Sequence, residues 1–231
     1  MLSDIFNNLD WSVVTDVITS VIPALICITF HELAHGFSAY ALGDRTAKDM
    51  GRLTFNPVKH IDVFGLIMMV IFKFGWAKPV PVNMNNFKKP KWHMALTAFA
   101  GPLSNIILAV IVLFIFWLVY TPLSAFETNS VAGIILSMIY LTAYISVALA
   151  VFNLLPIPPL DGSKVLFALL PSSGYRKLMQ HERYGMIVLF AFLSIDSFLN
   201  MNIFGATIGQ FTGKLFDSLL YFTSAAHRIA N

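Results

Sequence analysis

The sequence predicts an all-α polytopic membrane protein, with four to five transmembrane helices and a membrane-associated β-hairpin-like loop between the first two. Of the 231 residues, 57% are hydrophobic and only 12% are charged, and the mean hydropathy is +0.74. A soluble chain cannot bury that much apolar surface. Several apolar stretches approach or exceed the ~20 residues needed to cross a hydrocarbon core. The basic residues gather in segments between those stretches.

Charge and cysteine content further limit the possible classes of protein. The net charge of +3 and the pI of about 9.0 come from basic segments beside apolar runs, so we expect no nucleic-acid partner. Cys27 is the only cysteine, so no intrachain disulfide can form. Residues 1–11 carry acids but no Lys or Arg, unlike a signal peptide. We expect one membrane-embedded domain over 1–231, with its core at about 11–170 and C-terminal helices at about 184–226.

The first predicted span covers residues 11–42, and Pro23 is the site where it would kink. Near its end lies the polar group His31-Glu32-Leu33-Ala34-His35. Ionisable residues are costly to bury within a membrane segment and usually mark a functional site there.

The loop at 43–92 is broken up by Gly and Pro, and its apolar piece at 63–76 is too short to span. This pattern predicts hairpins that dip into the membrane. Non-helical backbone is tolerated at membrane depth only where it packs on protein or lines a wet cavity. We therefore expect the loop to lie against the polar group of the first span.

Further spans are predicted at 93–120, 131–155 and about 184–204. The second begins with small residues that allow close helix packing, and its Asn105 can bond to a neighbouring helix. The third ends in NLLPIPPLDG, where successive prolines break the helix. Residues 206–226 have apolar residues at helical spacing, which fits an interfacial helix, a helix packed into the bundle, or a fifth span.

The distribution of Lys and Arg predicts the orientation. The turn at 121–130 contains neither residue. The positive-inside rule therefore places the two basic segments in the cytoplasm and the N-terminus outside, so that the first and third spans both run inward. The basic residues are Arg45, Lys48, Arg52, Lys59, Lys73, Lys78, Lys88, Lys89 and Lys91 in the first segment, and Lys164, Arg176, Lys177 and Arg183 in the second.

The HExxH pattern of the first span is typical of a metalloprotease. His31 and His35 are four residues apart, so on a helix they lie on one face one turn apart, and Glu32 projects beside them. Catalytic zinc takes three protein ligands and keeps one position open, so a third ligand is required. Asp161 is the best candidate, because it follows a broken helix at the same predicted depth.

Other acidic residues and histidines that could bind the metal have simpler interpretations. Asp44, Asp49 and Asp62 lie in the basic loop, where solvated ion pairs account for them. Asp196 lies deep in the fourth predicted span, where a helix-packing or interfacial role is favoured. His60 has two ring nitrogens and is a candidate fourth ligand, although a hydrogen bond that organises the loop is the favoured interpretation. Four further acids, Asp4, Asp10, Asp16 and Glu127, fall on the opposite side of the predicted membrane.

Three motifs carry a resemblance to a known family. HELAHG (31–36), GPLSN (101–105) and NLLPIPPLDG (153–162) resemble the signatures of the site-2 protease family of intramembrane zinc metalloproteases, in order and spacing. GRLTFNPVKHID and GWAKPVPVN resemble that family's membrane-associated loop. The likeness covers about 20–170 and is closest to a minimal bacterial member without PDZ or CBS modules.

The resemblance implies one Zn²⁺ per chain, held by His31, His35 and Asp161, with Glu32 as the general base. It also implies that Asn153 lies near the active site as a substrate or oxyanion donor, although the residue pattern alone equally allows a helix cap. It implies transmembrane substrate proteins, the lipid bilayer as surroundings, a multi-pass bacterial cytoplasmic (inner) membrane location and an active site toward the cytoplasm.

The rival interpretation is a membrane metal transporter, or a catalytically silent metal-binding homologue, because intramembrane His and Asp also mark ion pathways. The Glu within HExxH and the apolar outer halves of the second and third spans argue against transport. A transmembrane substrate must unwind before it is cut, since its carbonyls are bonded within its own helix. The loop at 43–92 offers edges that could hold the unwound strand by β-addition.

Overall fold

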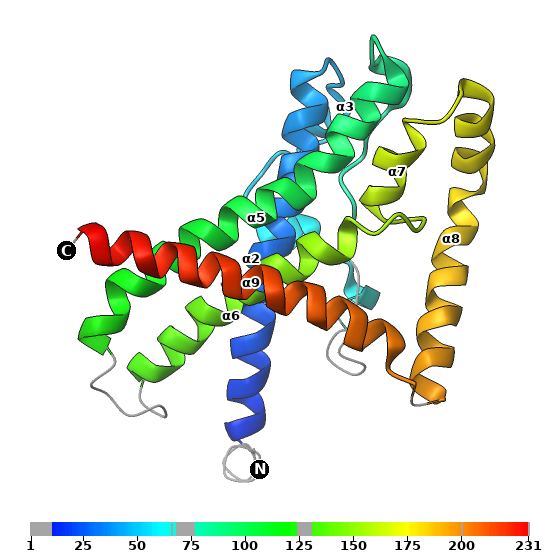
Figure 1. Cartoon of the computed structure of the whole chain (residues 1–231). Helices are drawn as coiled ribbons and strands as arrows, with labels where there is room; N and C mark the ends of the chain where they lie inside the picture. Colours follow the sequence, from blue (N-terminus) through cyan, green and yellow to red (C-terminus); the bar gives the residue numbers. More distant parts are fainter. Residues whose placement is uncertain (1–10, 66, 68–76, 124–130, 200, 231) are drawn as a thin grey trace, which may run out of the picture.

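The computed structural model describes residues 11–65, 67, 77–123, 131–199 and 201–230. Within these ranges the regular secondary structure consists of helices (Figure 1). The helices are α2 (Trp11–Ala41), α3 (Thr46–Asp49), α5 (Pro90–Leu123), α6 (Val131–Asn153), α7 (Asp161–Phe167), α8 (Ser172–Phe198) and α9 (Ile203–Ala230), with short 3-10 turns η1 (Pro57–His60) and η2 (Met84–Asn86).

Three helices are long and apolar enough to cross a membrane, over Val17–Ala41, Pro90–Tyr120 and Val131–Asn153. They are α2, α5 and α6, and they pack against one another. On α5 the large side chains of Ile107, Ile111 and Ile115 recur every four residues and are exposed, which marks a lipid-facing stripe. The three predicted core spans are therefore present, within a few residues of their expected bounds.

Small side chains bring these helices together. Ala109 of α5 and Ala143 of α6 are fully buried, and together with Leu113, Val147 and Phe216 they form one apolar cluster. Small residues at helix crossings allow the backbones to approach closely, which is how membrane helices gain packing energy. The cluster fixes α5, α6 and α9 relative to one another.

The prediction of four to five spans is not confirmed. The apolar part of α8 runs only from Tyr184 to Asp196, about 20 Å of helix against the ~30 Å of a hydrocarbon core. The fourth predicted span, at about 184–204, runs past the end of α8 into α9. The backbone N–H of Phe204 donates to Asp196 Oδ2 (3.2 Å), so Asp196 links the end of α8 to the first turn of α9.

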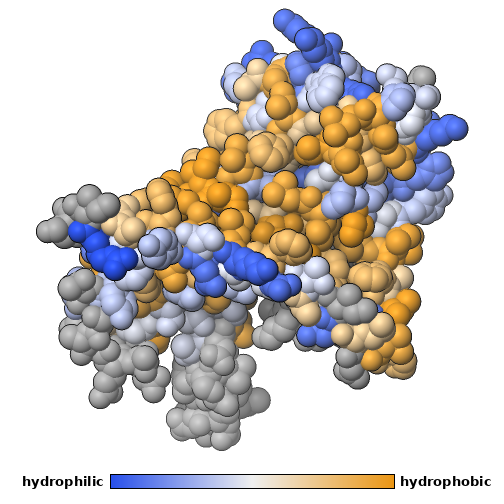
Figure 2. Space-filling model, viewed as in Figure 1, coloured by the Kyte–Doolittle hydropathy of each residue, from blue (hydrophilic) through white to orange (hydrophobic). Residues whose placement is uncertain are grey.

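Helix α9 crosses α5 and α6 (Figure 1) and packs on them through one face. Its Phe216 ring lies edge-on to Tyr140 and Tyr144, at centroid distances of 5.2 and 5.3 Å. Lys214 and Asp217 remain exposed on its outer face, where Figure 2 shows hydrophilic surface between hydrophobic areas. Of the three alternatives for this segment, a helix packed onto the bundle agrees best with these contacts.

The β-hairpin-like loop is likewise not confirmed. In the described parts of 43–92 there is no strand, only an isolated antiparallel bridge between Ile61 and Ala77. Pro79 and Pro81 follow the bridge and have no N–H to extend a ladder. Residue 66 and residues 68–76, which the hairpin prediction included, lie outside the described residues.

Asp44 corrects another expectation. It is fully buried and accepts hydrogen bonds from the backbone N–H of Thr46 (3.1 Å), the backbone N–H of Asn83 (2.7 Å) and Asn86 Nδ2 (2.7 Å). A solvated ion pair is therefore the wrong interpretation of Asp44. The carboxylate instead fastens the segment before α5 to the end of α2.

Candidate metal centre

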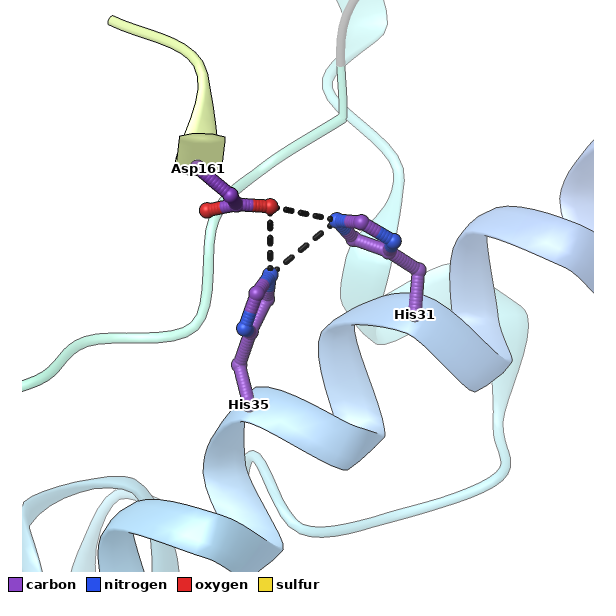
Figure 3. A group of neighbouring side chains, drawn as sticks. All are labelled: His31, His35 and Asp161. Carbon is purple, nitrogen blue, oxygen red and sulfur yellow. Dashed lines mark hydrogen bonds and ion pairs between the residues drawn. The ribbon is translucent and has the colours of Figure 1, made fainter. Parts of the chain in front are cut away.

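His31 and His35 project from one face of α2, one helical turn apart, as their spacing predicts (Figure 3). Their Nε2 atoms lie 3.0 Å apart. Oδ2 of Asp161 lies 3.1 Å from the first and 3.2 Å from the second. His31 and Asp161 are buried, and 12% of the His35 side chain is exposed. The three residues thus form one compact group.

Asp161 reaches this group because the chain turns back after α6. The helix ends at Asn153, the prolines follow, and Asp161 is the first residue of α7. Gly162 makes the turn possible, since a Cβ at this position would lie 2.1 Å from the carbonyl oxygen of Leu154. The proline break predicted from the sequence therefore delivers the carboxylate to the histidines.

The GPLSN segment of α5 lies directly against the histidine rings. A Cβ on Gly101 would lie 2.4 Å from His35 Nε2 and 2.7 Å from His31 Cε1. His35 Nδ1 lies 2.7 Å from the carbonyl oxygen of Thr97, to which it donates when it carries the proton. That bond directs the lone pair of His35 Nε2 into the group.

The group fits a zinc ion. Two imidazole nitrogens and a carboxylate oxygen are the donors that catalytic zinc prefers, and ligand atoms on a tetrahedral zinc are roughly 3.3 Å apart at ordinary bond lengths. The observed separations of 3.0 to 3.2 Å are close to that value. Zinc binds a carboxylate in its ionised form and an imidazole in its neutral form, and this donor set supplies one of the first and two of the second.

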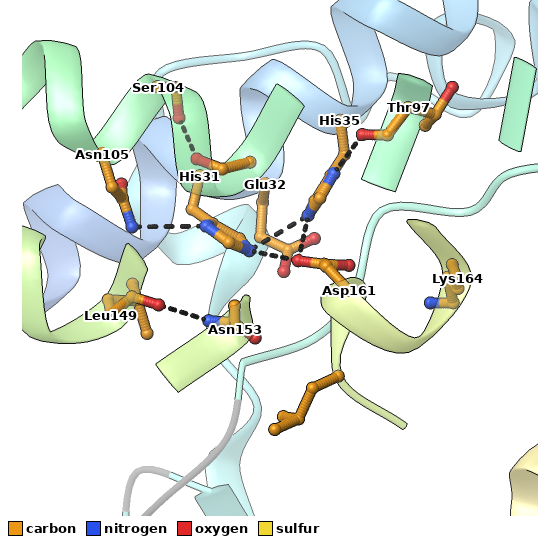
Figure 4. A network of polar contacts seen from close by, with 12 residues as sticks. His31, Glu32, His35, Thr97, Ser104, Asn105, Leu149, Asn153, Asp161 and Lys164 are labelled. Atoms are coloured by element: carbon orange, nitrogen blue, oxygen red, sulfur yellow. Dashed lines mark hydrogen bonds and ion pairs between the residues drawn. The ribbon is translucent and has the colours of Figure 1, made fainter. Parts of the chain in front are cut away.

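Glu32 faces the same cavity but is not among the three clustered residues that could hold a metal ion (Figure 4). Its Oε2 accepts a 2.7 Å hydrogen bond from the backbone N–H of Val80. The cavity has a volume of about 410 Å³. His31, Glu32, His35 and Asp161 all line it. The other lining residues include Ala77, Pro79, Val80, Val82, Thr97, Leu149, Phe152, Asn153, Lys164, Met186 and Leu189. The loop before α5 therefore forms one wall, as the sequence predicts.

The remaining predicted residues are placed as follows. Asn153 lines the cavity, and its Nδ2 donates to the Leu149 carbonyl oxygen of its own helix (3.0 Å). His60 is buried away from the ligand group and its Nε2 pairs with the Thr54 carbonyl oxygen (2.9 Å), the loop-organising bond favoured above. Asn105 lies beside His31, with 3.3 Å between Nδ2 and Nδ1.

Arg52 is a residue that the sequence analysis missed. Its side chain is buried, and Nη2 donates to the carbonyl oxygens of Lys78 (2.9 Å) and Pro79 (3.2 Å), immediately before Val80. It was counted only as one basic residue of the loop. Nothing in its residue type signals a backbone partner 26 positions away.

Two histidines and a glutamate on one turn of a membrane helix, completed by an aspartate from a broken segment, define a membrane-embedded HExxH metallopeptidase. The chain belongs to peptidase family M50, whose model matches residues 19–129 and 118–195. It is a zinc metalloendopeptidase of the site-2 protease type, as the resemblance implied.

Curated relatives agree with this assignment. The chain is 44% identical over 172 residues to "Putative zinc metalloprotease YwhC" of Bacillus subtilis (strain 168), covering 73% of this chain and 76% of that protein. It is 31% identical over 163 residues to zinc metalloprotease MJ0611 of Methanocaldococcus jannaschii, named in the same way, covering 70% and 75%. No solved structure matches the chain.

Proposed function

We propose that this protein hydrolyses peptide bonds in or beside the transmembrane segments of membrane proteins, with His31, His35 and Asp161 as zinc ligands and Glu32 as the general base. One observation carries the proposal. The ligand group and Glu32 face a single cavity, and three of these four residues lie within a helix that is long and apolar enough to cross a membrane. Peptidase chemistry is thereby brought to membrane depth.

Zinc, when bound, supplies Lewis acidity that makes water a better nucleophile near neutral pH and polarises the peptide carbonyl. The protein supplies the proton transfers. Glu32 accepts a proton from the attacking water and later passes it to the leaving amine. The hydrogen bond from Val80 N–H holds the Glu32 carboxylate in a fixed orientation. Asn153 exchanges its bond to the Leu149 carbonyl for one to the substrate.

The substrate binds in an extended conformation along the wall formed by the 77–82 segment. Ala77, Pro79, Val80 and Val82 line the cavity, and an extended peptide can add to an exposed backbone edge. A photocrosslinker at Val82 should capture a substrate trapped on Glu32→Gln. The same group at the exposed Lys59, in the same loop, should not. Capture at Lys59 alone would contradict this assignment.

The active site faces the cytoplasm of a bacterial cytoplasmic membrane, and the chain works there as one domain. The positive-inside rule supports this orientation, since basic residues flank the start of α5 and none lies in 121–130. Thiols introduced at the exposed positions Lys89 and Val131 should react with an impermeant reagent from opposite sides. Labelling of both from one side would refute the orientation.

A metal transporter is the less favoured function. Glu32 is not among the three clustered residues, and the relatives are named as metalloproteases. A catalytically silent homologue differs from a peptidase in only one measurable respect, which is turnover.

The deciding experiment compares the purified wild-type protein with Glu32→Gln in liposomes that contain a single-span test substrate. Fragments that appear only with the wild type support the proposed function, and quantitative proteomics of membrane fragments in cells carrying either form would identify natural substrates. Equal cleavage by both forms would refute Glu32 as the base. Absence of cleavage in both, with zinc bound, would favour the silent homologue.

A further inference from the structure

The His31 ring lies between the metal ligand group and a side chain of α5. Its Nε2 faces Asp161 Oδ2 at 3.1 Å, and its Nδ1 faces the amide of Asn105 at 3.3 Å. Both His31 and Asn105 are buried, and Asn105 is 0% exposed. Water therefore has no access to this contact, so the two side chains must satisfy one another.

The position of the proton on the His31 ring determines whether Nδ1 donates or accepts in this contact. A nitrogen that binds zinc is unprotonated, so a neutral imidazole bound through Nε2 carries its hydrogen on Nδ1. Nδ1 is then a donor and needs an acceptor. An amide NH₂ group offers only donors, so it cannot take this role.

The acceptor is on the same side chain. Asn105 Oδ1 is buried and has no hydrogen-bond partner among the described residues. A half-turn of the amide exchanges Nδ2 and Oδ1 without changing the shape of the side chain. Either orientation leaves one amide atom unpaired, so the number of hydrogen bonds does not choose between them. The two orientations are distinguished by the metal-bound imidazole, because its Nδ1–H needs an acceptor. Oδ1 must therefore face His31.

We propose that Asn105 is a positioning residue of the zinc site, whose Oδ1 accepts the Nδ1–H of His31 and thereby holds the Nε2 lone pair toward the metal. Groups that bind the second nitrogen of a metal-ligating histidine fix its tautomer and ring orientation. The proposal rests on the proposed function, because it assumes that His31 is a zinc ligand.

Asn105 lies where α5 meets α6. Its own carbonyl oxygen accepts a 2.8 Å hydrogen bond from Ser146 Oγ, which joins α5 to α6 at this level. The second histidine is held differently, because His35 Nδ1 pairs with the backbone carbonyl of Thr97. A substitution can therefore remove the acceptor of His31 but not that of His35.

The test measures metal affinity rather than activity. Detergent-purified protein, stripped of metal, is titrated with Zn²⁺ against a chromophoric chelator, and with Co²⁺ to record ligand-field absorption. Asn105→Ala and the nearly isosteric Asn105→Leu have no acceptor, and each should weaken zinc binding by about ten- to hundredfold. Asn105→Asp offers only acceptors, so it should retain the wild-type affinity and cobalt spectrum.

Ser146→Ala is the matched control, because it removes the bond to the backbone of Asn105 and leaves the amide intact. It should bind zinc as the wild type does. Wild-type affinity in Asn105→Ala and Asn105→Leu, or equal loss in Asn105→Asp, would overturn the proposal. If the first two variants do not fold, Asn105→Asp decides alone. Zinc retained by Asp161→Ala would instead refute the ligand set, so the two failures are distinguishable.

Discussion

The carboxylate of Glu32 and the backbone N–H of Val80 are joined by a 2.7 Å hydrogen bond across 48 positions of sequence. Every substitution of Val80 except proline keeps this backbone donor, so its position depends on what holds the chain around it. Arg52 does this by binding the two preceding carbonyl oxygens, of Lys78 and Pro79. The orientation of the proposed general base therefore depends on a buried arginine that does not line the cavity.

Arg52→Lys should lower kcat by roughly tenfold while zinc content stays unchanged, which corresponds to about 1.4 kcal/mol of transition-state stabilisation. An ammonium group is compact and lacks the planar fork of the guanidinium, so it holds two successive carbonyls less well. Peptidase assays paired with metal analysis measure both quantities. Lys59→Ala, an exposed change in the same loop, should leave both unaltered. Loss of zinc in Arg52→Lys would mean that Arg52 supports the whole fold of the site.

Asp161→Ala and Glu32→Gln should fail in different ways. The first removes a proposed ligand, so purified protein should lose zinc and activity together. The second keeps all three proposed ligands and removes only the proposed base, so it should be inactive with about one zinc per chain. Metal analysis after gel filtration separates the two. Full zinc in Asp161→Ala would place the third ligand elsewhere.

Gly101→Ala should weaken zinc binding by about ten- to hundredfold, the range for changes that disturb ligand orientation. The added methyl would need the space of the His35 ring, 2.4 Å away, so ring or helix must move. Gly209→Ala is the matched control, since nothing lies within 4 Å of its Cβ position. That change should be neutral or stabilise α9 by up to about 1 kcal/mol. Equal zinc affinity in both variants would contradict the close approach of α5 to the histidines.

Asp44→Asn should destabilise the protein near neutral pH by about 1.5 to 3 kcal/mol, because a charged acceptor of several hydrogen bonds is replaced by an amide that turns a donor toward donors. Burial alone would raise the pKa of Asp44, but hydrogen bonds from Thr46, Asn83 and Asn86 lower it. A lowered folded-state pKa contributes stability above the unfolded-state value of about 4, and this stability is lost as the pH falls through the folded-state pKa.

Thermal unfolding of the wild type and Asp44→Asn, followed from pH 7 to pH 3, measures this effect. The difference in midpoint should be constant down to about pH 4 and shrink below it. Asp49→Asn, an exposed change a few residues away, should show little difference at any pH. A gap between wild type and Asp44→Asn that widened on acidification would reverse the assigned sign.

The sequence predicted the parts of the molecule that depend on local periodicity. The helical repeat places His31 and His35 on one face, and hydropathy locates α2, α5 and α6. The proline run predicts the break that delivers Asp161. Contacts between distant segments were beyond the sequence, since the donors to Asp44 come from Asn83 and Asn86, about 40 positions away.

The two expectations that were not confirmed have local physical reasons. The fourth span was predicted from the average hydropathy over about 184–204. That average contains no information about helix ends, whereas α8 ends at Phe198 and α9 begins at Ile203. The hairpin prediction depended on apolar residues beside Gly and Pro, but Pro79 and Pro81 themselves remove the donors that a ladder needs. Arg52 was missed because its partners are backbone atoms, which carry no side-chain signature.

The separation of the proposed ligands along the chain also sets when the enzyme can become active. Asp161 lies 130 positions after His31, so a ribosome must complete α2, α5 and α6 before the proposed third ligand exists. Two histidines alone leave the zinc site one protein ligand short. The growing chain therefore enters the membrane without a complete catalytic centre, and peptidase activity begins only once the core helices have assembled around it.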